Sequence, residues 1–402
     1  MSCSGHGRAF LDSVVVNGVP MCECNTCYSG PDCSVLLPDC PIDVYSGDPV
    51  FLEPYWRKHA ASSAVLLSGW HRMTYEQTGK HHISLELEKC IRLLHDSVGN
   101  AVTKDRFIAF GTGATQLMNA LVYALSPDAA NNLSVPAARV VAAVPYYAVF
   151  KTQTEMFDFR ANKWEGSASD WKNSSNKYDF IEFVTSPNNP DGLFQQSVLG
   201  GASVIYDLCY YWPHYSAILS PADEDVMLFS MSKMSGHASS RFGWALLKDE
   251  KIFRKVLYYV NQNVIGTSGD THLRMLKIIK TILSGMRTKE DMFEFGYETM
   301  RERWKRFNEL ISSSEIFSLQ KLAPHNCTYF KKAKDPSPAY GWLKCEMEED
   351  RDCEDVLKRG GIISQGGINF GADRRYTRLS IMKTQDDFEL LMKKMEAIIS
   401  LK

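Results

Sequence analysis

The sequence has no excess of charge of either sign and no long apolar run. Its 402 residues carry 45 Lys+Arg and 47 Asp+Glu, so it lacks the basic surplus that nucleic-acid-binding proteins usually show. The longest apolar stretch, about residues 140–150, is far shorter than the roughly 20 residues of a membrane-spanning helix. We therefore expect neither a nucleic acid nor a membrane as partner. No repeat or low-complexity segment interrupts a chain whose length suggests two or three folded domains.

Cysteine is sparse in most of the chain but concentrated at its start. The first 40 residues contain six of the eleven cysteines and few large aliphatic side chains. A segment this small usually needs covalent staples in place of a core. The six are Cys3, Cys22, Cys24, Cys27, Cys33 and Cys40. Cys24 and Cys27 also have the spacing of zinc ligands, with His6 nearby. We favour three disulfides, whose pairing the spacing leaves open. The histidines elsewhere fit no helical ligand spacing, so we expect no metal.

Disulfides imply an oxidising compartment, and three Asn-x-Ser/Thr sequons agree with it. They begin at Asn132, Asn173 and Asn326, each in a polar segment that could carry a glycan. Cys345 and Cys353 flank an acidic run and could close a small loop. The remaining cysteines are expected to be buried thiols: Cys90, Cys209 and Cys327. No apolar leader follows the first methionine, so we expect that a leader has been removed or is missing. These features predict a glycoprotein of the secretory pathway.

Beyond residue 44 the sequence alternates between strand and helix patterns. Apolar residues recur at helical spacing over 83–98, and a glycine loop at 111–116 opens a helix that ends near 125. Several of the predicted strands are continuous apolar runs, which is typical of a parallel sheet covered on both faces. The predicted strands are 106–110, 139–144, 180–185, 202–206, 226–231, 242–247, 340–345 and 376–382; further helices are 251–261, 271–286 and 291–311. We infer an α/β fold with a module at 1–44, a large domain at 45–310 and a small α/β domain at 311–402.

Lys233 lies at the end of a predicted strand, three residues after Ser230 and directly after Ser232. Most loop lysines are solvated, but a lysine whose burial lowers its pKa can act as a Schiff-base nucleophile. Ser230 and Lys233 also match the Ser-x-x-Lys pair of acyl-transfer enzymes. The companion motifs of those enzymes, Ser-Asp-Asn and Lys-Thr-Gly, are missing from the sequence, so we set this alternative aside. Taken alone, Lys233 would be expected to be a solvated loop lysine.

Polar residues also follow other predicted strands, at the edge where open α/β sheets bind ligands. Each motif alone is common, but all of them in this order and spacing resemble one group of enzymes. The residues are Gly113, Thr115, Asn189, Asp207, Tyr210, Lys233 and, near the C-terminus, Arg378. The resemblance is to fold-type I pyridoxal-phosphate (PLP) enzymes of the aspartate-aminotransferase class, and it implies a large domain with a mainly parallel sheet.

Longer segments resemble the plant alliinase family over nearly the whole chain. That family combines an EGF-like head with a PLP body, and the run from Cys22 to Cys33 resembles the C-terminal half of an EGF-like module. The matching segments of the body are 68–72, 145–147, 185–190, 210–214 and 240–244. The resemblance implies the disulfides Cys3–Cys22, Cys24–Cys33, Cys27–Cys40 and Cys345–Cys353.

The resemblance assigns cofactor-binding roles. Lys233 would hold PLP covalently and, once substrate displaces it, remove the α-proton. Asp207 would pair with the pyridine nitrogen, Tyr210 and Asn189 would hydrogen-bond the phenolic oxygen, and Tyr147 would stack on the ring. The phosphate would lie at a helix N-terminus, where free N–H groups favour an anion. Its ligands would be Gly113, Ala114, Thr115, Ser232 and Arg241.

The same resemblance assigns substrate and partner contacts. Arg378 would bind the α-carboxylate of a small amino-acid substrate in a bidentate pair, and Ser46 and Gly47 lie in the segment that contacts substrate. Tyr75 would reach the phosphate of a second subunit, which implies a homodimer with shared active sites. A lectin or another protein is a further expected partner, and the family suggests the vacuole as the location.

The implied activity is β-elimination of S-alk(en)yl-L-cysteine sulfoxides of the alliin type, which releases a sulfenic acid, pyruvate and ammonia. The alternative is an L-tryptophan–pyruvate aminotransferase of the same fold. We take the EGF-like head as an argument for the lyase over this alternative. A storage or lectin-partner protein with an idle body is a third hypothesis, which the intact Lys233, Asp207 and Arg378 disfavour. Residues 76–80 are more polar than the family leads us to expect, and Met234 stands where a tyrosine is expected. The preferred S-substituent therefore stays open.

Overall fold

The computed structural model describes residues 2–9, 15–16, 18–71, 73–75, 84–127, 135–157, 160–173, 179–200 and 203–401. Within these ranges a seven-stranded sheet has the order β10-β9-β11-β12-β13-β14-β8. The strands are β8 (Phe107–Gly111), β9 (Ala138–Ala142), β10 (Asn162–Ser167), β11 (Phe180–Thr185), β12 (Ser203–Asp207), β13 (Val226–Ser230) and β14 (Gly243–Leu247). Only β14 runs antiparallel to its neighbours, so the α/β sheet is mixed and mainly parallel.

Both faces of this sheet are covered, which explains the continuous apolar runs. Successive side chains of a strand point to opposite faces. Trp244 of β14 therefore belongs to the core that contains the apolar faces of α3 (Leu85–Val98) and α8 (Gly269–Gly285). Its neighbour Ala245 belongs to the core with α4 (Gly113–Leu125) and α7 (Glu250–Val264). A sheet buried on both sides has no polar face, so the sequences of its strands show no alternation of apolar and polar residues.

Two of the longer helices of the body lie where the sequence analysis predicted none. α5 (Val149–Phe157) follows β9, and α11 (Gln385–Ser400) ends the chain. Both are amphipathic, and α11 is capped by the hydroxyl of Thr384, which accepts a hydrogen bond from the Asp387 N–H. The short helices that complete the large domain are α1 (Glu53–Lys58), α2 (Ala60–Ser63) and α6 (Met231–Met234).

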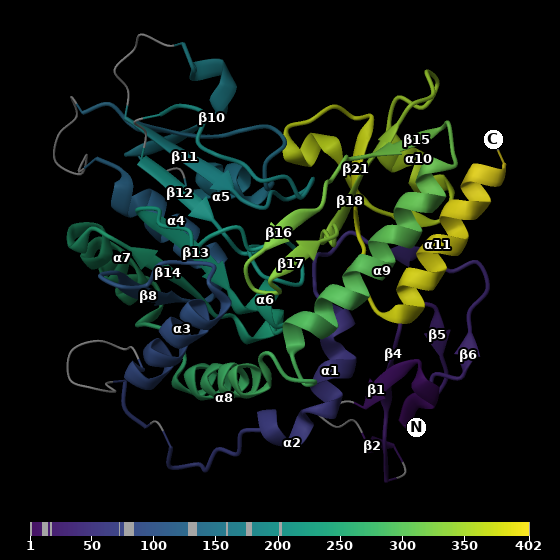
Figure 1. The fold of residues 1–402 in the computed structure, drawn as a ribbon, viewed down its shortest axis with the longest axis horizontal. Coiled ribbons are helices and arrows are strands. Elements are labelled where there is room, and N and C mark those ends of the chain that lie inside the picture. Colours follow the sequence, from purple (N-terminus) through teal and green to yellow (C-terminus); the bar gives the residue numbers. More distant parts are fainter. Residues whose placement is uncertain are drawn as a thin grey trace.

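A second, four-stranded antiparallel sheet forms the core of the C-terminal part, beside the large sheet (Figure 1). It has the order β15-β18-β21-β20, and α9 (Met292–Ser312), α10 (Cys353–Arg359) and α11 pack around it. The strands are β15 (Phe317–Leu319), β18 (Tyr340–Cys345), β20 (Gln365–Gly366) and β21 (Tyr376–Ser380); a hairpin of β16 (His325–Cys327) and β17 (Lys332–Lys334) precedes β18.

The segment just after the N-terminal module belongs in space to the C-terminal part. β7 (Ile42–Asp43) pairs in parallel with β19 (Ile362–Ile363), and the Phe51 N–H donates to the carbonyl of Met382. The chain therefore crosses from the small sheet to the large one only after this segment. The domain limits at residues 44 and 310 stay predictions.

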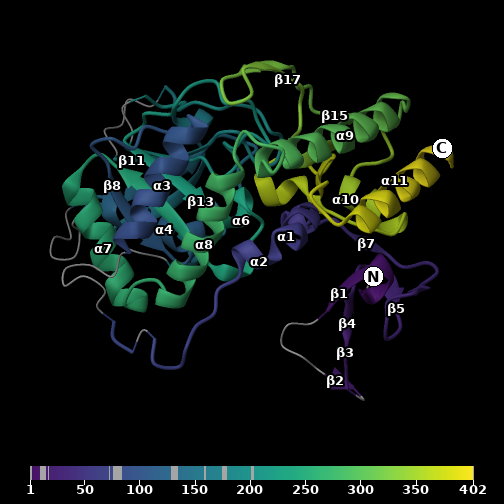
Figure 2. The same cartoon turned by 60° about the horizontal axis from the view of Figure 1, so that its bottom comes forward.

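The N-terminal module is a set of short strands joined by disulfides, and it lies beside α1 and α11 (Figure 2). Its strands are β1 (Gly7–Ala9), β2 (Val15–Val16), β3 (Val19–Pro20), β4 (Cys22–Cys24), β5 (Tyr28–Ser29) and β6 (Val35–Leu36). The structure pairs the cysteines as the alliinase resemblance implies: Cys3–Cys22, Cys24–Cys33, Cys27–Cys40 and, in the small domain, Cys345–Cys353.

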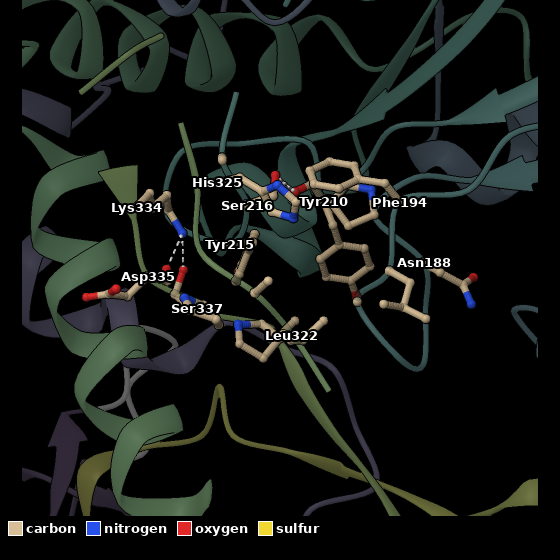
Figure 3. A pocket seen from close by; sticks show the side chains of 18 of the residues that line it. Asn188, Phe194, Tyr210, Tyr215, Ser216, Leu322, His325, Lys334, Asp335 and Ser337 are labelled. Atoms are coloured by element: carbon tan, nitrogen blue, oxygen red, sulfur yellow. Dashed lines mark hydrogen bonds between the residues drawn. The ribbon is translucent and has the colours of Figure 1, made fainter. Parts of the chain in front are cut away.

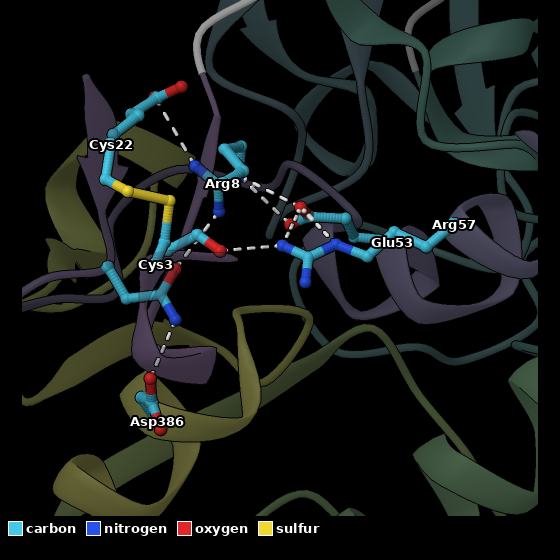
Figure 4. Close-up of polar contacts among 9 residues, drawn as sticks. Cys3, Arg8, Cys22, Glu53, Arg57 and Asp386 are labelled. Atoms are coloured by element: carbon cyan, nitrogen blue, oxygen red, sulfur yellow. Dashed lines mark hydrogen bonds and ion pairs between the residues drawn. A yellow bond between two sulfur atoms is a disulfide. The ribbon is translucent and has the colours of Figure 1, made fainter. Parts of the chain in front are cut away.

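Polar contacts fix the module to the body (Figure 4). Arg8 donates to both carboxylate oxygens of Glu53 at 3.1 Å, and Arg57 donates to the Gly7 carbonyl at 2.8 Å. On the other side, Asn25 donates to the carboxylate of Asp386 at 2.7 Å. Two elements of the body, α1 and α11, therefore hold the module at separate points.

Two of the three sequons lie at the surface. Asn173 and Asn326 are exposed, whereas Asn132 lies outside the described residues. Glycosylation of all three stays a prediction. The three cysteines without a disulfide partner, Cys90, Cys209 and Cys327, are buried thiols. In the part of the chain that the structure describes, no helix has the length and apolar character needed to cross a membrane.

Candidate active site

A cavity of about 230 Å³ opens at the carboxyl ends of β11, β12 and β13, where the large sheet faces the small domain. Most of the residues predicted for the site line it. They are Gly47, Ala114, Thr115, Tyr147, Asn189, Asp207, Tyr210, Ser232, Lys233, Arg241 and Arg378. The carboxyl ends of parallel strands meet at one sheet edge, and this brings together side chains that are distant in the sequence.

Lys233 is held at the centre of this cavity by its backbone and its side chain. β13 is buried along its whole length, and the Ser230 hydroxyl accepts from the Ser232 N–H at 3.1 Å and so caps α6. The hydroxyl of Tyr215 donates to the Lys233 carbonyl at 3.1 Å. At the tip of the side chain, the ammonium donates to the Gly47 carbonyl at 2.5 Å. The amine therefore points into the cavity from a fixed base.

A buried histidine supports the same backbone carbonyl. His214 has no exposed surface, and burial lowers the pKa of His214 to about 3. The ring is therefore neutral at physiological pH. Its Nε2–H donates to the Lys233 carbonyl at 3.3 Å. Two uncharged donors thus fix the lysine backbone without placing a charge beside it.

Asp207 ends β12 at the bottom of the cavity and is 5% exposed. Burial raises the pKa of its carboxyl group, and the hydrogen bond from Cys209 and the charge of Lys233 offset part of that rise. The Cys209 N–H donates to Oδ1 at 3.1 Å. A buried carboxylate without a bound cation is costly, so this position fits the protonated ring nitrogen of a pyridine cofactor.

The N-terminus of α4 borders the same cavity and is suited to hold an anion. Thr112 precedes the helix, and its side chain makes no capping hydrogen bond. Ala114 and Thr115 line the cavity with the first turn of the helix, where free N–H groups attract anions. Gly113 itself does not line the cavity, but it has a φ of 78°, and a Cβ there would lie 2.4 Å from the Arg241 guanidinium. Glycine therefore lets that cation approach the helix N-terminus.

The Arg378 guanidinium lies on the small-domain side of the cavity and is 4% exposed. It donates to Asn189 Oδ1 at 2.9 Å and to the Tyr45 carbonyl at 2.7 Å. Its Nε is buried and makes no hydrogen bond to the described residues. A buried guanidinium held only by uncharged oxygens fits the carboxylate of a substrate.

The structure adds Tyr340 to the predicted site. Its hydroxyl lies 2.5 Å from the Tyr210 hydroxyl, and its ring lies 4.2 Å from the Arg378 guanidinium carbon. A Cβ on Gly47 would lie 2.0 Å from the Tyr340 hydroxyl. Tyr340 is the first residue of β18, so only the docking of the small sheet brings it here. The sequence shows an apolar strand at this point and no signal of a site.

Three predicted site residues lie outside the cavity of a single chain. Gly113 lies behind the helix N-terminus, as described above. The Ser46 hydroxyl accepts from the Lys383 ammonium at 3.0 Å rather than lining the cavity. Tyr75 is 74% exposed, so its contact with a cofactor requires a second subunit and stays a proposal. Conversely, Ser230 and Cys209 line the cavity without having been predicted to bind the cofactor.

The lining residues fit PLP in chemical type. A lysine amine, a buried carboxylate and an anion cradle occupy separate positions around one cavity. These match the aldehyde, the ring nitrogen and the phosphate of that cofactor. Among the described residues no group of three or more His, Cys, Asp or Glu side chains is placed to bind a metal ion.

Two family models match the sequence. One, described as Allinase, matches residues 42–399, and the other, described as Alliinase EGF-like domain, matches residues 1–40. Alliin lyase of Allium cepa is 50% identical over 100% of this chain and 85% of its own length. Tryptophan aminotransferase-related protein 4 of Arabidopsis thaliana is 48% identical over 99% of this chain and 87% of its own length.

Solved structures with little sequence identity share the fold. A multiple substrate aminotransferase from Thermococcus profundus has a TM-score of 0.62 at 12% identity, over 90% of this chain and 91% of its own. The aspartate aminotransferase of Rhizobium meliloti has a TM-score of 0.62 at 14% identity, over 90% and 92%. The body therefore has the fold-type I aminotransferase architecture.

Proposed function

Since the chain belongs to the alliinase family, we propose that it is a PLP-dependent carbon–sulfur lyase that acts on S-alk(en)yl-L-cysteine sulfoxides. The products are a sulfenic acid, pyruvate and ammonia. The observation that carries this proposal is the convergence of Lys233, Asp207 and Arg378 on one small cavity. They supply an amine, a carboxylate and a guanidinium for the three fixed points that an α-amino-acid reaction on PLP requires.

Each residue has a task that follows from its position. When bound, PLP supplies the electron sink that stabilises negative charge at the substrate α-carbon. Lys233 attaches the cofactor and later accepts the α-proton, because its amine points into the cavity. Asp207 keeps the ring nitrogen protonated, and Arg378 orients the substrate by its carboxylate. Asn189 accepts a hydrogen bond from Arg378 and would hold the guanidinium beside the cofactor that the cavity would bind.

The lining that one chain supplies to the cavity favours a polar substrate side chain. Its aromatic side chains are Tyr147, Tyr210 and Tyr340, of which the last two bond to each other. The other large apolar side chain on the lining is Met118. An indole ring would need a wide apolar slot, whereas a short sulfoxide group needs little room and suits polar surroundings.

An L-tryptophan–pyruvate-type aminotransferase is the second candidate, and the 48% identity to a tryptophan aminotransferase-related protein favours it. The EGF-like head does not decide between the two activities, contrary to our use of it above. The alignment to that relative covers 99% of this chain and so extends through the head.

A homodimer with shared active sites is part of the proposal. Tyr75 lies in a segment that exposes several large apolar side chains: Leu66 (99%), Trp70 (76%) and Met73 (82%). Exposed apolar clusters of this kind mark interaction sites. We propose that this segment contacts the second subunit, with Tyr75 reaching the partner's phosphate cradle. The disulfides support a place in the secretory pathway, and a vacuolar location and occupied sequons are proposed with it.

Two reactions of the purified holoenzyme separate the two activities. Alliin alone should yield pyruvate at a rate proportional to enzyme, with no amino acceptor present. L-tryptophan plus pyruvate should yield no indolepyruvate. Indolepyruvate formation without pyruvate release from alliin would refute the lyase. Lys233→Ala should abolish turnover and the visible absorption of the cofactor, whereas Lys251→Ala, at an exposed position, should change neither.

A further inference from the structure

A second cavity, of about 350 Å³, lies beside the active site. Tyr210 and Tyr340 line both cavities, so their hydroxyl pair forms part of the wall between them. The remaining walls come from the loops after β11 and β12 and from the segments on either side of the β16–β17 hairpin (Figure 3). The volume is within the range of small-molecule binding sites, and nothing in the proposed reaction uses it.

A buried cation lines this cavity. Lys334 is 2% exposed, and its ammonium donates to the hydroxyl of Ser337 and, at 3.4 Å, to the backbone carbonyl of Asp335. It also lies 4.4 Å from the centre of the Tyr297 ring. All three of these groups are uncharged. Burial lowers the pKa of Lys334 to about 7, as expected for an ammonium that has lost water without gaining an anion.

The other side chains on the lining favour an anion with an apolar body. Figure 3 shows Lys334 and Ser337 on one side of the cavity and Phe194 toward the other. Phe194 and Leu322 provide apolar contact surface, and Lys321 and His325 add further basic side chains. The acidic side chain on the lining is that of Asp335, which is exposed.

We propose that this cavity is a second ligand site, which binds a small organic carboxylate with an apolar body. The carboxylate pairs with the Lys334 ammonium, and the apolar body lies against Phe194 and Leu322. The site is separate from the catalytic carboxylate site at Arg378. It does not depend on which of the two reactions the enzyme performs.

The proposed pairing of a carboxylate with Lys334 can be tested directly. The test compares the binding of benzoate to the holoenzyme with that of benzyl alcohol, its uncharged counterpart. By isothermal titration calorimetry, benzoate should bind roughly tenfold or more tightly than benzyl alcohol. Lys334→Met should weaken benzoate binding by about tenfold or more. Lys332→Met, which removes an exposed lysine of the same strand, should leave it unchanged. Leu322→Trp fills the cavity with Lys334 intact and should also abolish binding.

The site of binding is decided by comparison with an Arg378→Lys variant. If benzoate binding weakens in that variant but not in Lys334→Met or Leu322→Trp, the ligand occupies the catalytic cavity and the proposal is wrong. An absence of binding heat up to about 10 mM benzoate also overturns it. If Lys334→Met loses the circular dichroism of the native fold, Leu322→Trp alone decides.

Discussion

Gly47→Ala tests whether three separate parts of the chain meet at the proposed catalytic amine. The added Cβ would lie 2.0 Å from the Tyr340 hydroxyl and 3.2 Å from the Lys233 ammonium. Since real contacts of this type need more than about 3 Å, the Tyr340 side chain must move by roughly 1 Å. That motion disturbs the Tyr210 pair at 2.5 Å and the ring contact with Arg378 at 4.2 Å. Overpacking of about 1–3 kcal/mol should lower kcat/KM by roughly 5- to 150-fold.

A double-mutant cycle separates this collision from a general effect of the alanine. Tyr340→Phe removes the atom that the new methyl group meets, and the next contact is then 3.0 Å. Gly47→Ala/Tyr340→Phe should therefore be more active than Gly47→Ala alone, a non-additive result that marks direct contact. Lys251→Ala, at an exposed position of α7, is the control. Strictly multiplicative losses in the cycle, or a fully active Gly47→Ala, would refute the reasoning.

Three further predictions address the cofactor, the pH response and the N-terminal module. Asp207→Asn should reduce turnover about 100-fold or more while cofactor stays bound; turnover equal to that of the wild type would contradict the assignment. Burial lowers the pKa of His95 to about 4, so the unfolded chain binds this proton first as pH falls. The free energy of unfolding that the neutral His95 contributes is complete above pH 6.5, and about 3 kcal/mol of it is lost as the pH falls to 4. Equal midpoints of urea unfolding at pH 7.5 and pH 5 would contradict this. Glu53→Gln removes the carboxylate that faces Arg8 and should speed proteolytic release of the module, whereas Glu23→Gln, farther from Arg8 and more exposed, should have little effect.

Local sequence signals predicted six of the seven strands of the large sheet, and they missed β10. They also predicted the approximate limits of α3, α4, α7 and α8. The strands β11 and β13 are buried along nearly their whole length, so their apolar runs were readable without any partner. α3 begins after Ser84, whose side chain caps the helix, and ends at Gly99, which has a left-handed backbone conformation. These limits are close to the predicted 83–98. The direction of a strand leaves no such signal. The antiparallel orientation of β14 therefore could not be read from its equally apolar sequence.

The missed helices have different explanations. α5 contains Phe150 and Thr152, and aromatic and β-branched residues favour strands when judged alone. Packing of Phe150 against Phe183 of the sheet decides the outcome. In α11 the helical signal was present, since Phe388, Leu391, Met395 and Ile398 are buried at helical spacing. That helix could have been predicted from the sequence.

The proposed catalytic residues could be predicted only through resemblance, because each one is an ordinary residue in its local sequence. Asp207 and Lys233 follow apolar strands, and strand ends give a physical reason to expect a ligand there. Tyr340 follows no strand and carries no motif. Its role arises from the approach of two sheets, which no pattern within either sheet records.

The tyrosine pair links the two cavities to the arrangement of the two sheets. Tyr210 comes from the large domain and Tyr340 from the first residue of β18, so the 2.5 Å contact between their hydroxyls exists only when the domains are docked as they are here. The same docking places the Arg378 guanidinium within hydrogen-bonding distance of Asn189, and the Gly47 carbonyl against the Lys233 ammonium. A ligand bound in the second cavity would touch both tyrosines and so residues of both domains. Such a ligand would make more contacts when the two domains are docked than when they are apart. A difference of this kind is the physical requirement for a ligand at one site to change affinity at another.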